Sequence, residues 1–75
     1  MATRVLDTKG MNCPLPVLKA KKALGELSNG DTLKVLATDL GSVKDFEAFC
    51  RQTGHVLLEF NEDGGVLSFL IKNTA

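Results

Sequence analysis

Two prolines separated by one residue, Pro14 and Pro16, stand directly before a long segment with helical periodicity. Proline inside a helix removes a hydrogen bond and clashes with the preceding turn, but the first turn tolerates it because its N–H groups have no partner within the helix. The pair therefore predicts that a helix begins here. Leu15 precedes a proline and is biased away from helical angles, so regular helix could begin only at Pro16, and the cap geometry stays open.

A cysteine, Cys13, comes directly before the first proline. The first turn of a helix concentrates unpaired N–H groups and positive partial charge, which favour the nucleophilic thiolate over the thiol. The prolines remove two of these donors, so chiefly the N–H groups of Leu15 and Val17 remain near the sulfur. We expect mild activation of Cys13, which suits a sulfur that has to be passed on, and Cys13 is the first candidate for chemistry.

The remaining periodicity predicts two helices and four strands. Residues 3–8 form a short strand that ends in a turn at Lys9 and Gly10, and residues 32–38 alternate as a second strand. The predicted inward-facing positions of this second strand are Leu33, Val35 and Ala37. Those of the first helix are Cys13, Val17, Ala20, Leu24 and Leu27.

The second half of the chain predicts a helix and a hairpin. Ser42 is the expected N-cap of the helix, with Asp45 completing a variant of the capping box, and Gly54 suits the left-handed residue after its end. Residues 63–65 (Asp-Gly-Gly) predict the hairpin turn. The expected buried positions are Val43, Phe46, Phe49, Cys50 and Thr53 on the helix, Val56, Leu58 and Phe60 on one strand, and Leu67, Phe69 and Ile71 on the other.

This order, βαβαββ, predicts an α+β fold in which a mixed four-stranded sheet carries both helices on one face, because crossovers between parallel strands are right-handed. The chain of 75 residues is short enough for one domain, 1–75, without a deep substrate cavity. The other face of the sheet is then left open. It is expected to carry Leu36, Leu57, Val66 and Leu70, which is more apolar surface than such a face requires.

Composition excludes several classes of function. Nine basic and nine acidic residues give zero formal net charge, which argues against phosphate-backbone binding as the main task, so no direct contact with nucleic acid is expected. The N-terminal residues lack the apolar core of a signal peptide, and no apolar run approaches the roughly 20 residues that span a bilayer. We expect a soluble cytoplasmic protein that does not bind membranes.

The cysteines do not predict a disulfide scaffold or a metal site. Cys13 and Cys50 lie on different expected helices, and small secreted scaffolds usually carry more bridges, so reduced thiols are expected. Structural zinc needs four ligands in characteristic pairs, whereas this chain offers two isolated cysteines and one histidine. Cys50 shares a helical stripe with Phe46, which favours a core role, and the alternative is a resolving thiol that would have to meet Cys13.

Several features of the chain occur together: the first strand, the segment Asp7 to Asn12, the Cys13-Pro14-Leu15-Pro16 element at a helix start, and Ala37-Thr38-Asp39 before the second helix. In this combination the chain resembles the TusA/SirA family of small sulfur carriers. The resemblance covers nearly the whole chain. It implies a two-layer α/β sandwich of βαβαββ order whose last strand lies inside the sheet, a place that the apolar residues 67–71 suit. Pro14 and Pro16 then belong to the Cys-Pro-x-Pro motif.

The resemblance also implies a function for Cys13, which matches the family cysteine. Cys13 would receive sulfur as a persulfide from a cysteine desulfurase or a rhodanese-like donor and pass it to an acceptor protein in a sulfur relay. Family members serve tRNA thiolation, oxidation of sulfur compounds and cofactor biosynthesis, and the residues do not choose among these pathways. The protein is expected to act as a carrier more than as an enzyme, without a cofactor and as a monomer.

Three lysines, Lys19, Lys21 and Lys22, give the first helix a basic flank. The simpler interpretation is a solvated face, and the functional one is a docking surface for an acidic patch on the donor or acceptor. Two other functions stay open. A small thiol redox protein would ordinarily need the second cysteine of a Cys-x-x-Cys pair, which Cys13-Pro14-Leu15-Pro16 lacks, and a non-catalytic interaction or regulatory module would use the open sheet face.

Overall fold

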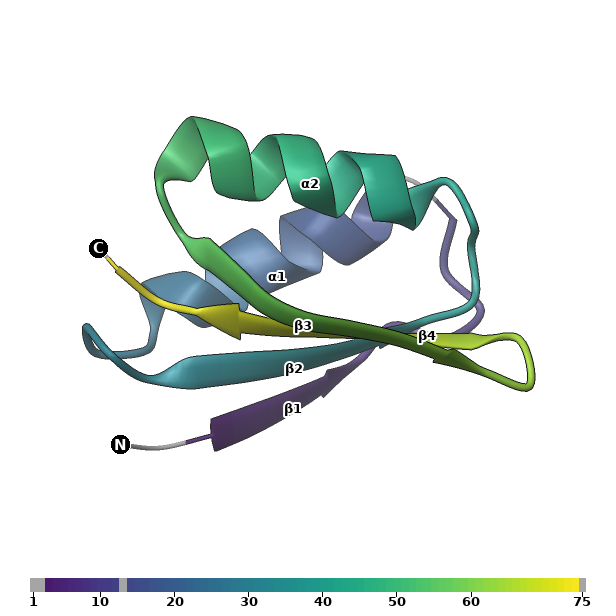
Figure 1. Ribbon diagram of the computed structural model, residues 1–75, viewed down its shortest axis with the longest axis horizontal. Helices are drawn as coiled ribbons and strands as arrows, with labels where there is room; N and C mark the ends of the chain where they lie inside the picture. Colours follow the sequence, from purple (N-terminus) through teal and green to yellow (C-terminus); the bar gives the residue numbers. More distant parts are fainter. Residues whose placement is uncertain (1–2, 13, 75) are drawn as a thin grey trace.

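Two helices lie side by side on one face of a four-stranded sheet in the computed structural model, which describes residues 3–12 and 14–74 (Figure 1). The order of elements is βαβαββ, as the sequence predicts. The elements are β1 (Thr3–Asp7), α1 (Leu15–Gly25), β2 (Thr32–Ala37), α2 (Ser42–Thr53), β3 (Val56–Asp63) and β4 (Val66–Lys72).

The sheet is mixed, with the strand order β1-β2-β4-β3. β1 runs parallel to β2, and β4 is antiparallel to both β2 and β3. The last strand of the chain therefore lies inside the sheet, as the family resemblance implies. Gly64 and Gly65 both have positive φ, 58° and 84°, and form the two-residue turn that joins β3 to β4.

The core lies between the helices and the sheet, and it contains the inward-facing positions predicted for β2, β4 and the middle of both helices. Leu33, Val35 and Ala37 of β2 alternate with more exposed neighbours and have no exposed surface. The buried apolar residues are Ala20, Ala23, Leu24, Leu33, Val35, Ala37, Phe46, Phe49, Cys50, Leu67, Phe69 and Ile71. Val17, Leu27 and Val43 pack against this cluster while staying partly exposed.

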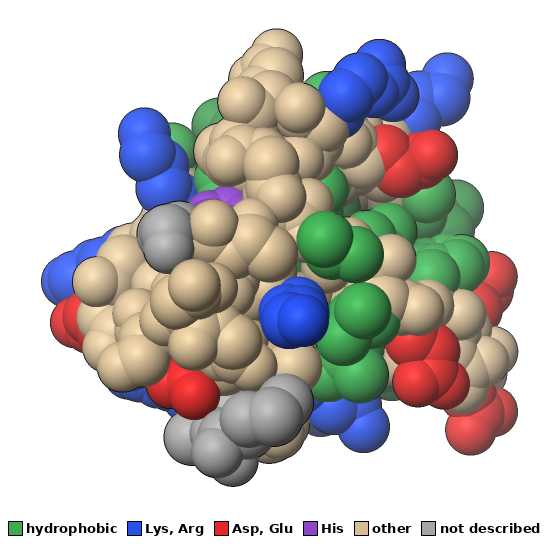
Figure 2. Space-filling view, turned by 60° about the vertical axis from the view of Figure 1, so that its left-hand side comes forward, with side chains coloured by type: hydrophobic (Ala, Val, Ile, Leu, Met, Phe, Trp, Pro, Cys, Tyr) green, Lys and Arg blue, Asp and Glu red, His purple; other side chains and the backbone are tan. Residues whose placement is uncertain are grey.

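The orientation predicted for β3 is wrong at Val56 and Leu58, because the strand contains a bulge. The register with β4 shifts between Leu57 and Glu59, so the alternation of inward and outward residues breaks at this point. Leu57 packs against the core, whereas Val56 and Leu58 are 44% and 50% exposed. Phe60 pairs with Phe69 and their rings lie 5.2 Å apart, but Phe60 keeps 45% of its surface exposed on this edge strand. Figure 2 shows hydrophobic side chains at the surface on one side of the molecule, next to charged groups.

The open face of the sheet carries Leu36, Val66 and Leu70, as predicted, and each is partly buried. Leu57 does not belong to this face, because the bulge turns it toward the helices. Val5, which pairs with Lys34, adds a side chain that is 59% exposed. Polar and charged residues thus interrupt the apolar surface of the open face.

The predicted ends of α2 are partly correct. Gly54 has φ 84° and its N–H donates to the carbonyl of Cys50, which ends the helix as expected. The N-cap is Gly41 and not Ser42, because the Ser42 hydroxyl donates to the carbonyl of Asp39 and makes no side-chain cap. Thr53, predicted to be buried, is exposed, and its hydroxyl donates to the carbonyl of Phe49.

Candidate functional site

The segment that connects β1 to α1 is tied to the end of β2. Thr8 has no exposed surface, and both its N–H and its hydroxyl donate to the carbonyl of Leu36, at 2.8 and 2.6 Å. The N–H of Met11 then donates back to the carbonyl of Thr8 at 3.1 Å and closes a turn. These bonds bring the chain from the sheet to the start of α1 along a defined path.

The start of α1 carries the two prolines at the predicted place. Pro14 is the N-cap, with φ −98° and ψ 14°, and Pro16 lies within the first turn of the helix. Leu15, despite preceding a proline, is already the first helical residue. Cys13, the expected sulfur carrier, lies outside the described residues. It precedes Pro14 in the chain, and the site is therefore described from the residues on either side of it in the sequence.

One donor that was expected to serve the sulfur is already used. The N–H of Leu15, which is expected near the sulfur, donates to the carbonyl of Asn12 at 2.9 Å. The first turn of α1 contains no acidic residue, and Pro14 makes no side-chain cap. The positive end of the helix is therefore not neutralised by a carboxylate of the same turn, which favours an anion at this end.

A furrow runs between the two helices beside the start of α1. Both helices begin at the same end of the molecule (Figure 1), so the first turns of both reach this place. The depression has a volume of about 220 Å³. Its lining residues, here called the helix furrow, are Pro14, Val17, Asp45, Ala48, Phe49 and Gln52. It is smaller than most ligand pockets, which hold about 300–1,000 Å³, and is large enough for one side chain of a partner.

The three lysines of α1 are all exposed but do not form one patch. At about 100° per residue, Lys19 and Lys21 lie on opposite flanks of the helix and Lys22 lies between them on the outer side. The outer side also carries two apolar residues, Leu15 and Leu18, which are 47% and 54% exposed. The solvent-facing half of α1 is thus basic and apolar together.

Cys50 lies in the core and not at the site. Its side chain belongs to the buried cluster, and only 7% of the residue is exposed. Desolvation by burial raises the pKa of the Cys50 thiol above its usual range, so the thiol stays protonated and unreactive at neutral pH. This agrees with the core role that the sequence favours.

Several residues of the site are not apparent from the sequence. The sequence predicts only a capping role for Asp45 and no role for Gln52, yet both line the helix furrow. The spacing of Asp45, Ala48, Phe49 and Gln52 places them on one stripe of α2, but only the packing of α2 against α1 shows which element the stripe faces. The exposure of Leu15 and Leu18 on α1 is also not apparent from the sequence, because it depends on how the helix packs on the sheet.

Neither helix in the described part of the chain is long and apolar enough to cross a membrane. Within the same residues, no three His, Cys, Asp or Glu side chains gather in a way that could hold a metal ion.

Comparison with known proteins places this architecture in one family. The family model described as sulfurtransferase TusA matches residues 4–73. The sulfur carrier protein TusA of Allochromatium vinosum is 58% identical over 69 residues, which cover 92% of this chain and 91% of that protein. The sulfur carrier protein TusA of Pseudomonas putida is 41% identical over 71 residues, which cover 95% and 89%.

A solved structure agrees in fold. The crystal structure of a SirA-like protein from Desulfitobacterium hafniense superposes with a TM-score of 0.82 over the whole of both chains, at 32% sequence identity. The shared fold, the family match over residues 4–73 and the identity with named sulfur carriers confirm the resemblance seen in the sequence. This chain belongs to the TusA family of sulfurtransferases.

Proposed function

We propose that the protein is a sulfur carrier in which Cys13 accepts sulfur as a persulfide and passes it to an acceptor protein. The observation that carries this proposal is the placement of Pro14 as the N-cap of α1 in a chain of the TusA family. The residue before that cap is next to the positive end of a helix whose first turn holds no carboxylate. A thiolate or persulfide anion is favoured at such a place.

The transfer exchanges one sulfur–sulfur bond for another. The Cys13 thiolate attacks the terminal sulfur of a donor persulfide, and the donor's sulfur–sulfur bond breaks with its electron pair remaining on the donor cysteine. Cys13 then holds the terminal sulfur as a persulfide, and the donor leaves as a thiolate. In the second transfer, the acceptor thiolate attacks the terminal sulfur of the Cys13 persulfide, and Cys13 leaves as a thiolate. No external oxidant or reductant is consumed, so no cofactor is required.

Donor and acceptor dock, in this proposal, on the solvent-facing half of α1. Lys19, Lys21 and Lys22 supply positive charge there, and Leu15 and Leu18 supply apolar contact area. Surface lysines steer an acidic partner more than they hold it, and exposed leucines favour release of water on contact. The donor is a cysteine desulfurase or a rhodanese-like protein, and the acceptor is a relay protein of tRNA thiolation, sulfur oxidation or cofactor biosynthesis.

Two rival functions make different predictions. A thiol redox protein would need Cys50 to meet Cys13, but Cys50 is buried in the core and its thiol pKa is raised by burial. A purely interaction-based module would not load sulfur at all. The cytoplasm remains the proposed location, because a carrier thiol stays reduced in a reducing compartment.

The test is incubation with a cysteine desulfurase and L-cysteine, followed by intact-mass analysis. We expect one added sulfur atom that dithiothreitol removes and that an acceptor thiol protein takes up. An adduct that no reductant removes, or no adduct at all under conditions that load another TusA protein, would reject the carrier function.

A further inference from the structure

We infer that Thr38 is a positioning residue for the sulfur-carrying segment, and this inference rests on the proposed function. Thr38 follows the last residue of β2, and its hydroxyl oxygen accepts a hydrogen bond from the N–H of Gly10 at 2.9 Å. The two residues are 28 positions apart in the chain. The bond joins the loop after β2 to the segment that leads into α1.

The hydrogen bond between Gly10 and Thr38 holds a turn that lies just before the start of α1. Gly10 has φ 83°, in the left-handed region, so the chain reverses sharply at this residue. The turn lies three residues before Cys13 and four before the N-cap Pro14. Thr8 fixes one side of the turn through the carbonyl of Leu36, and Thr38 fixes the other side at Gly10.

Thr38 and its neighbour Asp39 make hydrogen bonds at the starts of different helices. The Asp39 carboxylate accepts from the N–H of Gly41, and the Asp39 carbonyl accepts from Ser42, so Asp39 shapes the entry into α2. Thr38 instead reaches back across the end of the sheet to the entry of α1. The Thr-Asp pair therefore sets both helix starts that border the helix furrow.

The hydrogen bond between Thr38 and Gly10 should affect the reactivity of the Cys13 thiol. Thr38 acts by holding the segment 9–12 on its path to α1 and not by contact with a reacting atom. Without the bond, this segment samples more conformations, and the sulfur spends less time at the positive end of the helix. The intrinsic reactivity of the thiol and the rate of sulfur loading should both fall, because both depend on that placement.

The test compares Thr38→Val, which removes the acceptor oxygen at nearly constant volume, with Thr38→Ser, which keeps it. Thr53→Val is a matched control, because Thr53 is also an exposed threonine whose hydroxyl bonds the backbone, but at the far end of α2. The readouts are sulfur loading by a cysteine desulfurase with L-cysteine, the pH profile of Cys13 alkylation in a Cys50→Ala background, and hydrogen exchange at the Gly10 amide.

We expect Thr38→Val to lower the loading rate about tenfold, within the range that misplacement of a reacting group costs. The alkylation profile should move to higher pH, and the Gly10 amide should exchange faster. Thr38→Ser and Thr53→Val should stay within about twofold of the wild type. Thr38 is exposed, so the variants should fold, and Thr38→Ala, which also lacks the oxygen, must show the same defect.

Two results would overturn the role of Thr38. One is loading and alkylation by Thr38→Val equal to the wild type, and the other is an equal defect in Thr38→Ser, which would show that the hydroxyl is not responsible. Failure of the proposed function looks different, because the wild-type protein itself would then fail to load. In that case, unchanged exchange at the Gly10 amide in Thr38→Val would still reject the positioning bond.

Discussion

The side-chain amide of Asn73 donates a hydrogen bond to the carbonyl of Leu27 at 2.9 Å, across 46 residues of the chain. The same amide lies 3.2 Å from the carbonyls of Leu24 and Ser28, and Asn73 is only 1% exposed. Carbonyls in the last turn of a helix lack their regular donor four residues on. Those of Leu24 and Ser28 also accept from the N–H groups of Leu27 and Asp31, so Asn73 is an additional donor there. Asn73, directly after β4, therefore supplies the C-terminal end of α1 with donors and joins the helix to the middle of the sheet.

Replacing Asn73 by alanine should destabilise the fold by about 1–3 kcal/mol, because it removes a buried side chain and its hydrogen bonds to the carbonyls around the end of α1. Urea denaturation of the two proteins measures the difference. Asn61→Ala is the control, since Asn61 is exposed on β3, and its effect should stay within about 0.5 kcal/mol. Equal stability of Asn73→Ala and the wild type would show that water replaces the side chain at no cost.

Cys50→Ala should lose about 1–2 kcal/mol of stability at neutral pH, the scale of a small core truncation. This difference should shrink at alkaline pH. Burial raises the pKa of the Cys50 thiol, so the unfolded chain ionises first as the pH rises. The contribution of Cys50 is complete below the unfolded pKa and is lost as the pH rises through the folded pKa.

Denaturation of the wild type and Cys50→Ala in parallel, from neutral to strongly alkaline pH, isolates this effect, because all other titrating groups are shared. A difference in stability that does not change with pH would contradict the raised pKa.

Replacing Lys19 and Lys22 by glutamate should slow sulfur transfer from a protein donor but leave the reaction of Cys13 with a small thiol reagent nearly unchanged. Both lysines are exposed and lie about 8 and 12 Å along the helix from Pro14, so solvent screens their effect on the thiol. Their effect on the approach of a charged partner acts through the same solvent and depends on ionic strength. The defect should therefore fade with added salt. Stopped-flow transfer assays at several salt concentrations measure it.

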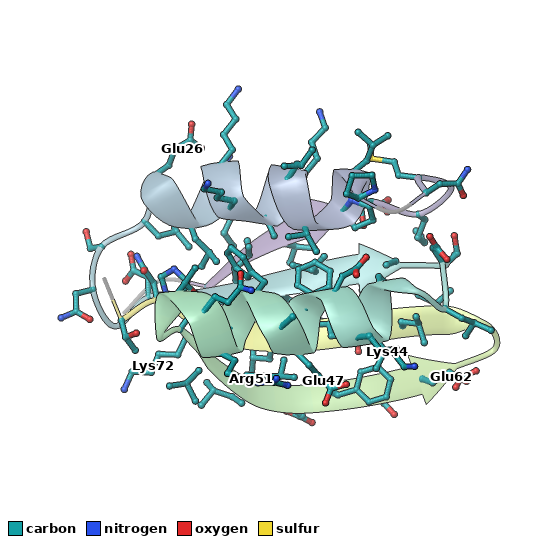
Figure 3. All side chains as sticks on the ribbon, turned by 90° about the horizontal axis from the view of Figure 1, so that it is seen from above. Glu26, Lys44, Glu47, Arg51, Glu62 and Lys72 are labelled. Carbon is teal, nitrogen blue, oxygen red and sulfur yellow. The ribbon has the colours of Figure 1, made fainter. Side chains whose placement is uncertain are left out.

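Lys34→Glu and Lys44→Glu together form the matched control, because both residues are exposed and neither lies on α1. Figure 3 shows Lys44, with Glu47 and Arg51, on the side of α2 that faces away from α1. If this control slows transfer as much, or if the defect of the α1 variant ignores salt, the lysines of α1 are an ordinary solvated surface.

The sequence predicts the fold because its local signals agree with one another. Alternation in β2 and β4, the glycines of the hairpin turn and the prolines before α1 each point to the observed element. The orientation of β3 could not be predicted, because its bulge appears only in the register with β4. The prediction that Ser42 is the N-cap of α2 is wrong because the Ser42 hydroxyl donates to the carbonyl of Asp39. This contact, too, is not visible in the sequence pattern.

The site was predicted in part. The position of the helix start, marked by Pro14 and Pro16, is encoded in a few adjacent residues and is therefore visible in the sequence. The roles of Thr38 and Asp45 depend on contacts between segments that are distant in the chain, at Gly10 and in the helix furrow. No local periodicity encodes such contacts.

Sulfur loading of Cys13→Ser and Cys50→Ala, measured side by side by intact mass after incubation with a cysteine desulfurase and L-cysteine, tests the central claim most directly. Serine is close to cysteine in size but offers no sulfur, so Cys13→Ser should fold like the wild type, judged by circular dichroism, and carry no added sulfur. Cys50→Ala should load fully. Loading of Cys13→Ser equal to the wild type, or loss of loading in a well-folded Cys50→Ala protein, would contradict the assignment of the carrier role to Cys13 alone.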